Sequence, residues 1–300
     1  MIWSNLVLLN KELPSNYICY RTITIDPNTM EPPYIDIGSW GRVLISTGKV
    51  TLSLLNDNKE ILIKHVLSAG QLFLIPPYVW LNLDITTNDF SGQIDLYCHP
   101  NTYFNKKYDL KNPHSSVVAL RNNYLISSDK RLDVLDLGAG RGRNSLYMSQ
   151  FNNKVSAYDV DEKQIFRLEH IIKEEKIKHL TANVLDLEEE IITGHYDVVI
   201  CTVVLQFLSK HTAWQLLSNA QKSTKIGGYH VIVCPVNTPE TQFPKHFSFL
   251  LEPNQLIEFY RDKSWATLEY SEDFGHLHKT AKDGLPIRGR FATLIAQRVI

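Results

Sequence analysis

The first hundred residues alternate apolar and polar positions in short runs, the period of β-strands that bury one face. Turn residues such as Asn56–Asn58 and Gly70 separate these runs. No helix of three turns fits between Gly38 and Pro100. We therefore predict a small all-β domain, a sandwich or a barrel, over residues 1–104. The expected strands lie within residues 42–48, 49–58, 60–70, 71–85 and 92–98.

The pattern changes after Pro100, where a polar segment leads into a helical pattern from Ser115 to Leu125. From Leu132 onward, continuous apolar runs typical of parallel strands buried on both faces alternate with amphipathic helical segments. This alternation predicts an open α/β domain over residues 105–300, with helices on both faces of a parallel sheet. The expected strands lie within residues 132–138, 154–159, 179–187, 196–207 and 230–236, and the helices within 144–151, 162–177 and 212–224. Residues 264–273 and 290–300 predict two more strands, joined by a charged loop.

Charge and composition narrow the class of partner. The chain has 31 basic and 32 acidic residues and a net charge of -1, so neither a nucleic-acid partner nor binding to anionic lipid is expected. No apolar run approaches the roughly 18 residues of a membrane span, and we expect no secretory leader. Four scattered cysteines without a C-x-x-C pair favour reduced thiols. We expect a cytoplasmic monomer or homodimer that binds a small molecule.

A glycine-rich loop marks the candidate site. Gly138, Gly140 and Gly142 stand between the first predicted parallel strand and the helix that follows. Open sheets of this kind bind ligands at the carboxyl ends of their strands, and glycines let a ligand approach the backbone closely. The dinucleotide fingerprint would need glycine at position 143, where Arg143 stands, and no Walker A lysine follows.

The spacing instead reads acid-x-Gly-x-Gly-x-Gly, with Asp136 as the acid. A carboxylate this close to the loop would repel a pyrophosphate but suit a ligand that carries an ammonium and a sulfonium. S-adenosylmethionine carries both, and we predict it as the cofactor.

Two further carboxylates follow later strands. Asp159 lies about 20 residues beyond the loop, where it can accept hydrogen bonds from ribose hydroxyls, although NAD would use the same contact. Asp186 follows the third strand, where methyltransferases of this fold bind the adenine amino group; alternatively, it caps a helix or begins a solvated acidic run. The candidate cofactor residues are Asp136, Gly138, Ala139, Gly140, Arg143, Asn144, Asp159, Val160, Asp186, Leu187 and Thr202.

Several segments together resemble a known family. Residues 135–149 (LDLGAGRGRNSLYMS), 196–208, 223–233 and 275–296 are similar to the tellurite-resistance methyltransferases of the TehB type. The β domain is similar to the cupin-like domain that precedes the methyltransferase in longer members. The resemblance implies a Rossmann-like class I methyltransferase whose seven-stranded sheet is mostly parallel with an antiparallel last strand. It also implies methylation of tellurite and perhaps of selenite.

The same resemblance suggests where the acceptor binds. In this fold the sixth strand runs toward the ligand edge, so the loop from Ser271 to Pro286 should hang over the cofactor. His278, Lys279 and Arg288 are then the candidate catalytic residues, since their charge could attract an oxyanion and His278 could take a proton. The family has a His-Arg pair where this chain has His278-Lys279, which keeps the charge but loses bidentate recognition. It often has Cys at the position of Ala139, where the backbone does the binding.

Other features keep two interpretations. Lys107 and Tyr108 could reach the carboxylate of the cofactor, or they belong to a solvated linker. Phe243, Phe247 and Phe249 could form an apolar lid or pack into the core.

The β domain departs from the cupin metal motif. Leu81 stands at the position of the histidine ligand and His65 has no partner at ligand spacing, so we expect no metal. We expect this domain to be structural, oligomerising or ligand-sensing.

The acceptor is not fixed by the fold. An organic thiol or another metabolite remains an alternative acceptor. A non-catalytic S-adenosylmethionine sensor or an NAD-linked oxidoreductase remains an alternative class of protein.

Overall fold

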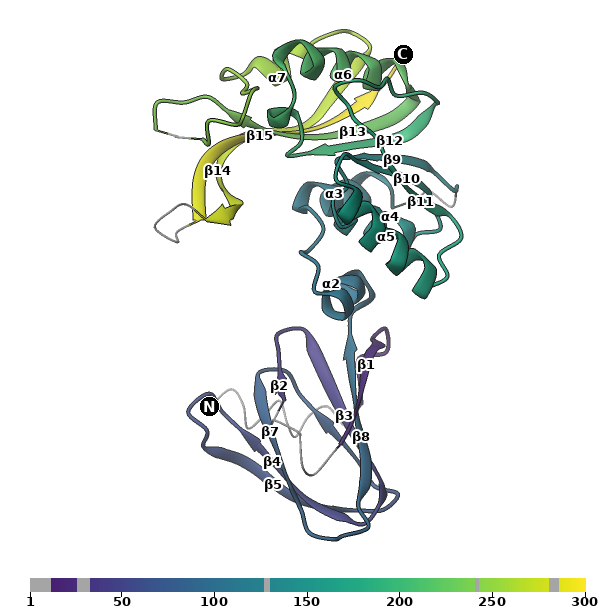
Figure 1. Ribbon diagram of the computed structural model, residues 1–300, viewed down its shortest axis with the longest axis vertical. Coiled ribbons are helices and arrows are strands. Elements are labelled where there is room, and N and C mark those ends of the chain that lie inside the picture. Colours follow the sequence, from purple (N-terminus) through teal and green to yellow (C-terminus); the bar gives the residue numbers. More distant parts are fainter. Residues whose placement is uncertain (1–11, 26–32, 127–129, 241–242, 281–285) are drawn as a thin grey trace. The chain divides into compact units, whose positions relative to one another are not determined.

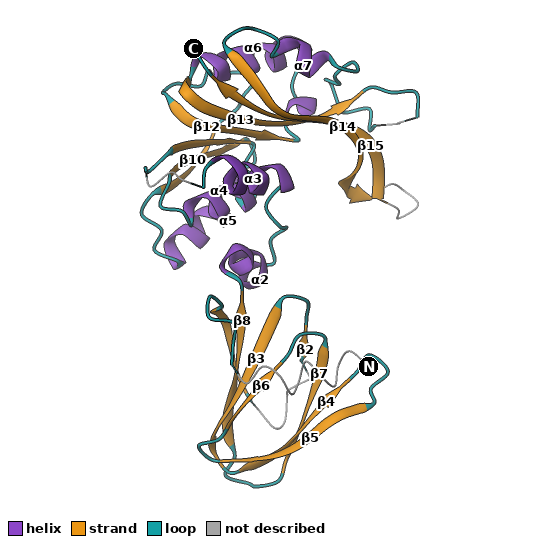
Figure 2. Ribbon diagram, turned by 180° about the vertical axis from the view of Figure 1, so that it is seen from behind, coloured by secondary structure: helices purple, strands orange, loops and turns teal. Residues whose placement is uncertain are grey.

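The computed structural model describes residues 12–25, 33–126, 130–240, 243–280 and 286–300. The chain divides into two compact units, residues 1–110 and residues 111–300, each with its own hydrophobic core (Figures 1 and 2). The division predicted after residue 104 falls within helix α2 (Tyr103–Tyr108), which belongs to the first unit. No helix in the described ranges is long and apolar enough to cross a membrane.

The first unit is an antiparallel β structure of two four-stranded sheets, with the strand orders β1-β8-β3-β6 and β2-β7-β4-β5. Its inward-facing side chains are fully buried in one core, among them Ile45, Leu52, Leu81 and Ile94. The all-β prediction for this part is confirmed. The elements are β1 (Ile18–Thr24), β2 (Tyr34–Ile35), β3 (Ser39–Thr47), β4 (Lys49–Leu55), β5 (Ile61–Ser68), β6 (Leu72–Ile75), β7 (Val79–Ile85), β8 (Ser91–Cys98), the 3-10 turn η1 (Pro100–Thr102) and α2.

The structure divides one predicted run, residues 71–85, between the two sheets. β6 pairs with β3, whereas β7 pairs with β4 and β2. Pro76 and Pro77 have no backbone N–H to donate, and Tyr78 has a φ of 64°, so the chain cannot continue as one strand here. The alternation of apolar and polar residues is the same in both halves, so the pattern alone predicts a single run.

The second unit contains a seven-stranded sheet with the order β11-β10-β9-β12-β13-β15-β14. The first five of these strands pair in parallel, as the apolar pattern predicts, and β15 is antiparallel to both neighbours, as the family resemblance implies. Figure 1 shows α3, α4 and α5 on one face and α6 and α7 on the other. The strands are β9 (Asp133–Leu137), β10 (Lys154–Asp159), β11 (Leu180–Val184), β12 (Tyr196–Thr202), β13 (Thr224–Val236), β14 (Trp265–Thr280) and β15 (Pro286–Arg298). The helices are α3 (Ser115–Ala119), α4 (Arg143–Ser149), α5 (Glu162–Glu174), α6 (Lys210–Lys222) and α7 (Gln255–Phe259), with the π-helix η2 (Leu120–Tyr124) and the 3-10 helix η3 (Leu205–Phe207).

Local sequence explains the elements around the candidate site. In β9, Val134, Leu135 and Leu137 are at most 1% exposed, because helices cover both faces of the parallel strand. Helix α5 begins where the side chain of Asp161 accepts hydrogen bonds from two backbone N–H groups of its first turn. Its apolar stripe, formed by Ile165, Leu168 and Ile171, is buried as the 3.6-residue period predicts.

The prediction of a charged loop from Ser271 to Pro286 is wrong for the described part of that range. The strands continue through it, with Gly275 opposite Gly289 and Thr280 opposite Pro286. A two-stranded ribbon that leaves its sheet has no core to bury, so its strands tolerate charged residues that otherwise indicate a loop. In Figure 1 this ribbon curves away from the rest of the sheet.

Candidate functional site at the carboxyl edge of the sheet

The candidate site lies where the order of the strands reverses. β9 stands between β10 and β12, so successive connections leave it in opposite directions. The carboxyl ends of these three strands bring together the glycine loop, Asp159 and Thr202. Residues separated by more than 60 positions in the sequence thus meet at one edge.

Two glycines of the loop serve different purposes. Gly138 has a φ of 66°, and a Cβ atom there would collide with the side chain of Val204 after β12. Gly140 has a φ of 54°, but no described atom lies within 4 Å of the position of its Cβ. Packing therefore requires the first glycine, whereas the second leaves open backbone that a ligand can approach.

Asp159 holds this open backbone in place. Its Oδ2 accepts a hydrogen bond from Gly140 N at 2.7 Å, and its Oδ1 accepts one from Asp161 N at 2.9 Å. A carboxylate oxygen can accept more than one hydrogen bond, so both oxygens keep capacity for ribose hydroxyls. The geometry is compatible with the predicted ribose contact, which stays a prediction.

Asp186 closes a turn after β11. Its Oδ1 accepts from Glu188 N at 2.9 Å, and its carbonyl oxygen accepts from Glu189 N and Glu190 N. This arrangement corresponds to the capping alternative that the sequence left open. A contact with adenine would have to use the remaining capacity of this carboxylate.

Asp136 is 1% exposed and accepts a hydrogen bond from Ser145 Oγ at 2.5 Å. Burial raises the pKa of Asp136 to about 7, although the hydrogen bond from Ser145 and the charge of Arg143 act in the opposite direction. This carboxyl lies inside the unit and supports α4 through Ser145. Its predicted attraction for the positive groups of the cofactor stays a prediction.

Asn144 and Thr202 connect three segments. Asn144 Nδ2 donates to Thr202 Oγ1 at 3.1 Å, and Asn144 Oδ1 accepts from His114 N at 2.9 Å. Both side chains are buried, at 3% and 7% exposed. They fix the loop, the end of β12 and the start of α3 relative to one another.

The other predicted cofactor residues lie in different surroundings. Ala139 is buried and donates its N–H to Tyr158 O at 2.9 Å, and Leu187 belongs to the core. Val160 is 62% exposed, and Arg143 is half-buried. Burial lowers the pKa of the Arg143 guanidinium, while the carboxyl of Asp136 raises it. Their predicted contacts with the cofactor remain predictions.

Sequence reasoning gave no signal for Val203, directly after β12. It has a φ of 61°, which is strained for a β-branched residue. Its N–H donates to Val233 O at 2.8 Å, so the sheet holds it in this conformation. Strain of this kind concentrates at functional sites, and here it occurs beside the glycine loop.

The ribbon of β14 and β15 extends past the same edge. Val236, at the carboxyl end of β13, pairs with Arg290, so the residues that precede Arg290 in β15 lie beyond that end. Arg288 is exposed and stands opposite His276 in the ribbon. His278 and Lys279 belong to β14, but their side chains lie outside what the structure describes.

Aromatic rings surround the base of the ribbon. Phe243 contacts Phe291 edge-on at 5.7 Å, and its ring fills the space where a side chain at Gly289 would stand. Phe247 contacts Phe207 of η3 at 5.3 Å. Phe243 and Phe247 are half-buried and Phe249 is buried, so the segment is partly core and partly surface.

No group of three or more His, Cys, Asp or Glu side chains in the described ranges could hold a metal ion. Leu81, at the position of a cupin histidine, is fully buried in the apolar core. His65 is exposed, and its ring contacts Phe73 at 5.2 Å.

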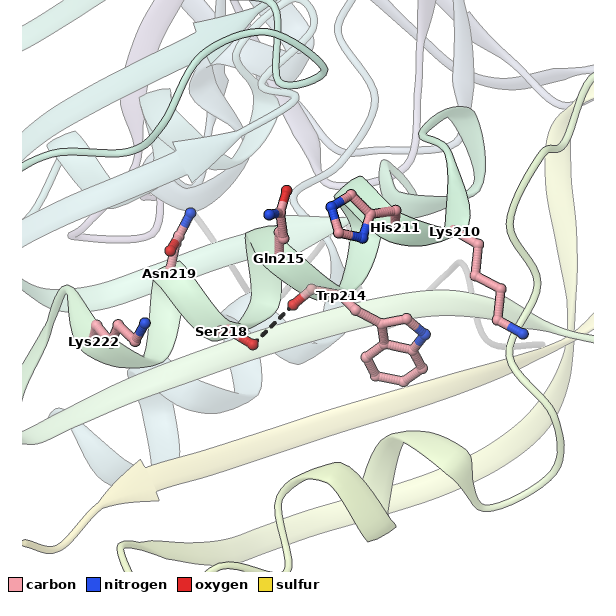
Figure 3. Close-up of a pocket in the computed structure, with 7 residues that line it drawn as sticks. All are labelled: Lys210, His211, Trp214, Gln215, Ser218, Asn219 and Lys222. Atoms are coloured by element: carbon pink, nitrogen blue, oxygen red, sulfur yellow. Dashed lines mark hydrogen bonds between the residues drawn. The ribbon is translucent and has the colours of Figure 1, made fainter.

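A groove along α6 is distinct from the candidate site (Figure 3). Its lining comes from one helix, and Ser218 Oγ donates to Trp214 O at 3.0 Å within it. Trp214 packs against Phe249 and Phe259, at ring distances of 5.4 Å and 5.0 Å. None of the described residues that line this groove is predicted to bind the cofactor or the acceptor. The lining residues are Lys210, His211, Trp214, Gln215, Ser218, Asn219 and Lys222.

Comparison with known proteins identifies the family of the chain. The model of the family described as tellurite resistance protein TehB matches residues 96–295. The chain belongs to the TehB family. It is 31% identical over 293 residues to a protein of Haemophilus influenzae (strain 10810) named probable S-adenosyl-L-methionine-dependent methyltransferase TehB, with 95% of this chain and 100% of the relative covered.

A solved structure extends the match to the whole fold. The crystal structure of TehB from Haemophilus influenzae superposes with a TM-score of 0.82 at 30% identity, covering 95% of this chain and 99% of that chain. The chain is therefore an S-adenosylmethionine-dependent methyltransferase. Family membership decides against the NAD-linked oxidoreductase and the non-catalytic sensor. The open backbone at Gly140 and the carboxylate of Asp159 fit this cofactor.

Proposed function

We propose that this TehB-family enzyme methylates a small, soft oxyanion, with tellurite as the first acceptor to test and selenite as the second. The observation that carries the proposal is the register of the ribbon, which extends β14 and β15 beyond the edge where the glycine loop lies. That stretch of sequence contains His278, Lys279 and Arg288. A cationic ribbon beside the cofactor site suits an anionic acceptor.

The cofactor would be held at the carboxyl edge of the sheet. Gly140 offers open backbone, Asp159 would accept from the ribose hydroxyls, and Asp186 would accept from the adenine amino group. When bound, S-adenosylmethionine supplies a methyl carbon whose bond to a positively charged sulfur breaks as a lone pair of the acceptor bonds to it.

Positioning, more than acid-base chemistry, would then govern the rate. The cationic residues of the ribbon would attract the oxyanion and hold its lone pair toward the methyl group. His278 could remove a proton from an acceptor that carries one. Lys279 binds an anion as a point charge, so it would hold several oxyanions with little geometric selection.

The aromatic rings favour one second candidate, an organic thiol or another small metabolite. Phe207 is 50% exposed, and its ring stacks against His246 at 6.2 Å. Exposed rings near the candidate site would contact the apolar part of an organic acceptor, which tellurite does not have.

An acceptor screen tests the proposal. The purified enzyme is incubated with S-adenosylmethionine and with tellurite, selenite or a panel of thiols, and S-adenosylhomocysteine is measured. We expect product with tellurite at a rate well above that without acceptor. Turnover with thiols but not with the oxyanions would favour the second candidate. If none of the tested acceptors raised the rate, both candidates would be contradicted.

The variant His278→Ala tests the role of the ribbon. We expect kcat/KM for the oxyanion to fall on the order of 100-fold, since the change removes a hydrogen-bonding imidazole that could also accept a proton. The affinity for S-adenosylhomocysteine, measured by calorimetry, should not change. His211→Ala, on the exposed face of α6, is the control. Equal losses of rate and cofactor affinity would show that His278 is structural.

A further inference from the structure

Gln206 in η3 is a buried polar residue outside the predicted cofactor and acceptor residues. Its side chain is fully buried, and its Nε2 donates a hydrogen bond to Val203 O at 2.8 Å. Its Oε1 is buried as well, and no described atom donates a hydrogen bond to it. The amide therefore makes one defined contact, with the carbonyl of the residue that directly follows β12.

The unpaired oxygen limits what this amide contributes to stability. A buried amide oxygen that loses water without gaining a donor costs folding free energy, which offsets the gain from the Nε2 contact. Met has a side chain of similar length without a polar N or O atom, so it would fill the same space without this cost. Stability alone therefore does not account for an amide at this position, and its effect lies in the placement of Val203.

Val203 and Val204 form the turn that Gln206 holds. Val203 has a φ of 61°, a conformation that persists in a β-branched residue only where neighbouring contacts fix it. Its N–H donates to Val233 O, so the sheet holds one side of this residue and Gln206 holds the other. The side chain of Val204 in turn packs on Gly138, in the space that a Cβ atom at this glycine would fill. The placement of the glycine loop against the end of β12 thus depends on this turn.

The backbone of Gln206 connects the same turn to the aromatic segment that follows β13. Gln206 O accepts hydrogen bonds from Ser248 N at 2.8 Å and from Phe249 N at 3.4 Å. The next residue along the chain, Phe207, is 50% exposed, and its ring contacts Phe247 at 5.3 Å. Gln206 therefore joins the turn beside the glycine loop to the rings that could contact an acceptor.

We propose that Gln206 is a positioning residue for methyl transfer, which holds the turn between the cofactor side and the acceptor side of the site. The proposal rests on the cofactor site described under the proposed function, and it applies to an oxyanion and to an organic acceptor alike. Methyl transfer needs the lone pair of the acceptor in line with the bond between the methyl carbon and sulfur, at about 3 to 3.5 Å. Loosening the turn would shift the glycine loop relative to residues 244–249, so the two reactants would be misaligned while each still binds.

Steady-state kinetics of Gln206→Met test the proposal, because Met fills a similar volume but has no N–H to donate to Val203 O. We expect kcat to fall about 10- to 100-fold, measured with tellurite or with the acceptor of the panel that is methylated. The KM for that acceptor and the dissociation constant of S-adenosylhomocysteine should change less than about twofold, since alignment and not binding is lost. An unchanged kcat would overturn the proposal. Parallel changes in all three quantities would show that Gln206 is structural and would overturn it too.

The matched control is Gln215→Met, at an exposed position of α6. It makes the same chemical change away from the turn, and we expect wild-type values of kcat, KM and the dissociation constant. A similar fall of kcat in this control would show that the effect is not specific to the turn and would contradict the positioning role.

Amide hydrogen exchange without ligand tests the link itself and needs no acceptor. Ser248 N–H is the probe, because its acceptor is Gln206 O. In Gln206→Met we expect faster exchange in peptides that cover residues 203–208 and 244–249, and wild-type exchange in peptides of α5. Faster exchange in the first peptide alone, or in neither, would show that Gln206 does not join the two segments. If the wild-type enzyme methylated none of the tested acceptors, the proposed acceptors would fail, whereas this exchange pattern would still decide whether Gln206 makes the link.

Discussion

The amino and carboxyl edges of the parallel strands differ in how their charged side chains are partnered. At the amino edge, Lys225 Nζ lies 2.6 Å from Asp133 Oδ2 and 2.8 Å from Asp197 Oδ2. Burial alone would raise the pKa of Asp197, but hydrogen bonds from Lys225 and from the backbone of Asp133 hold it below its usual range. Opposite charges here join the starts of β9, β12 and β13.

The carboxyl edge has the reverse arrangement. Asp136 is buried and accepts hydrogen bonds from Ser145 but has a raised pKa, Lys111 and Arg143 have the same sign, and Val203 is strained. Each feature costs folding free energy, and each stands next to the proposed cofactor site. We infer that the amino edge stabilises the sheet, whereas the carboxyl edge is arranged for ligands at the expense of stability.

Of the variants considered, Asp136→Asn should reduce the difference in stability between the two edges most strongly. The rise of the pKa from 3.8 to about 7 means that the folded state binds a proton more tightly than the unfolded state does. The stability that this proton contributes to the folded state is fully present below pH 3.8 and is lost as the pH rises through 7. At about 1.4 kcal/mol per pKa unit, the variant should gain up to roughly 4 kcal/mol in the free energy of unfolding at pH 8.

Urea unfolding at pH 5 and pH 8 measures this gain. The difference between the two pH values should shrink in Asp136→Asn but persist in Glu169→Gln, an exposed residue of α5. The same pH dependence in both variants would show that Asp136 is not the titrating group.

The variant Asp159→Ala sharpens the comparison from the ligand side. It removes the predicted ribose contact and the acceptor that fixes Gly140 N. We expect the binding free energy of S-adenosylmethionine to weaken by about 1 to 3 kcal/mol. Calorimetry measures this loss, and an unchanged dissociation constant would remove Asp159 from the site.

The variant Lys225→Met tests the amino edge and should have the smallest effect. It keeps the apolar part of the side chain but leaves Asp133 and Asp197 without their shared cation. Lys225 is 33% exposed, so we expect a loss of only about 1 to 2 kcal/mol in the free energy of unfolding. Cofactor affinity should stay at the wild-type value, with Lys222→Met at the end of α6 as the control. A loss of affinity would show that the two edges are coupled.

The sequence predicted the parallel part of the fold because burial on both faces leaves an unbroken apolar run. Val134 to Leu137 in β9 is an example, and the helix of Ile165 to Ile171 follows its own period equally clearly. The ribbon in which Gly275 stands opposite Gly289 escaped prediction because a two-stranded ribbon that leaves its sheet needs no regular alternation of apolar and polar residues. The proline at position 76 indicates a break in the strand. That the chain changes from one sheet to the other at this break depends on tertiary pairing, which the sequence does not show.

The candidate site divides in the same way. The glycine loop and Asp159 could be predicted, because a strand, a turn and a helix follow one another in sequence. The burial of Asp136 and the φ of Val203 depend on packing against other segments, for which single residues give no signal. The hydrogen bond from His114 N to Asn144 Oδ1 is likewise a tertiary contact that the sequence does not indicate.

Amide hydrogen exchange with and without S-adenosylhomocysteine tests most directly whether the cofactor binds at the carboxyl edge. We predict slower exchange on binding in the peptides that contain Gly138–Gly142, Asp159–Asp161 and Lys111–Val117. Peptides around Asp133, Asp197 and Lys225 at the amino edge should exchange at the same rate in both states. Protection that was confined to the amino edge, or to the first unit, would contradict the account.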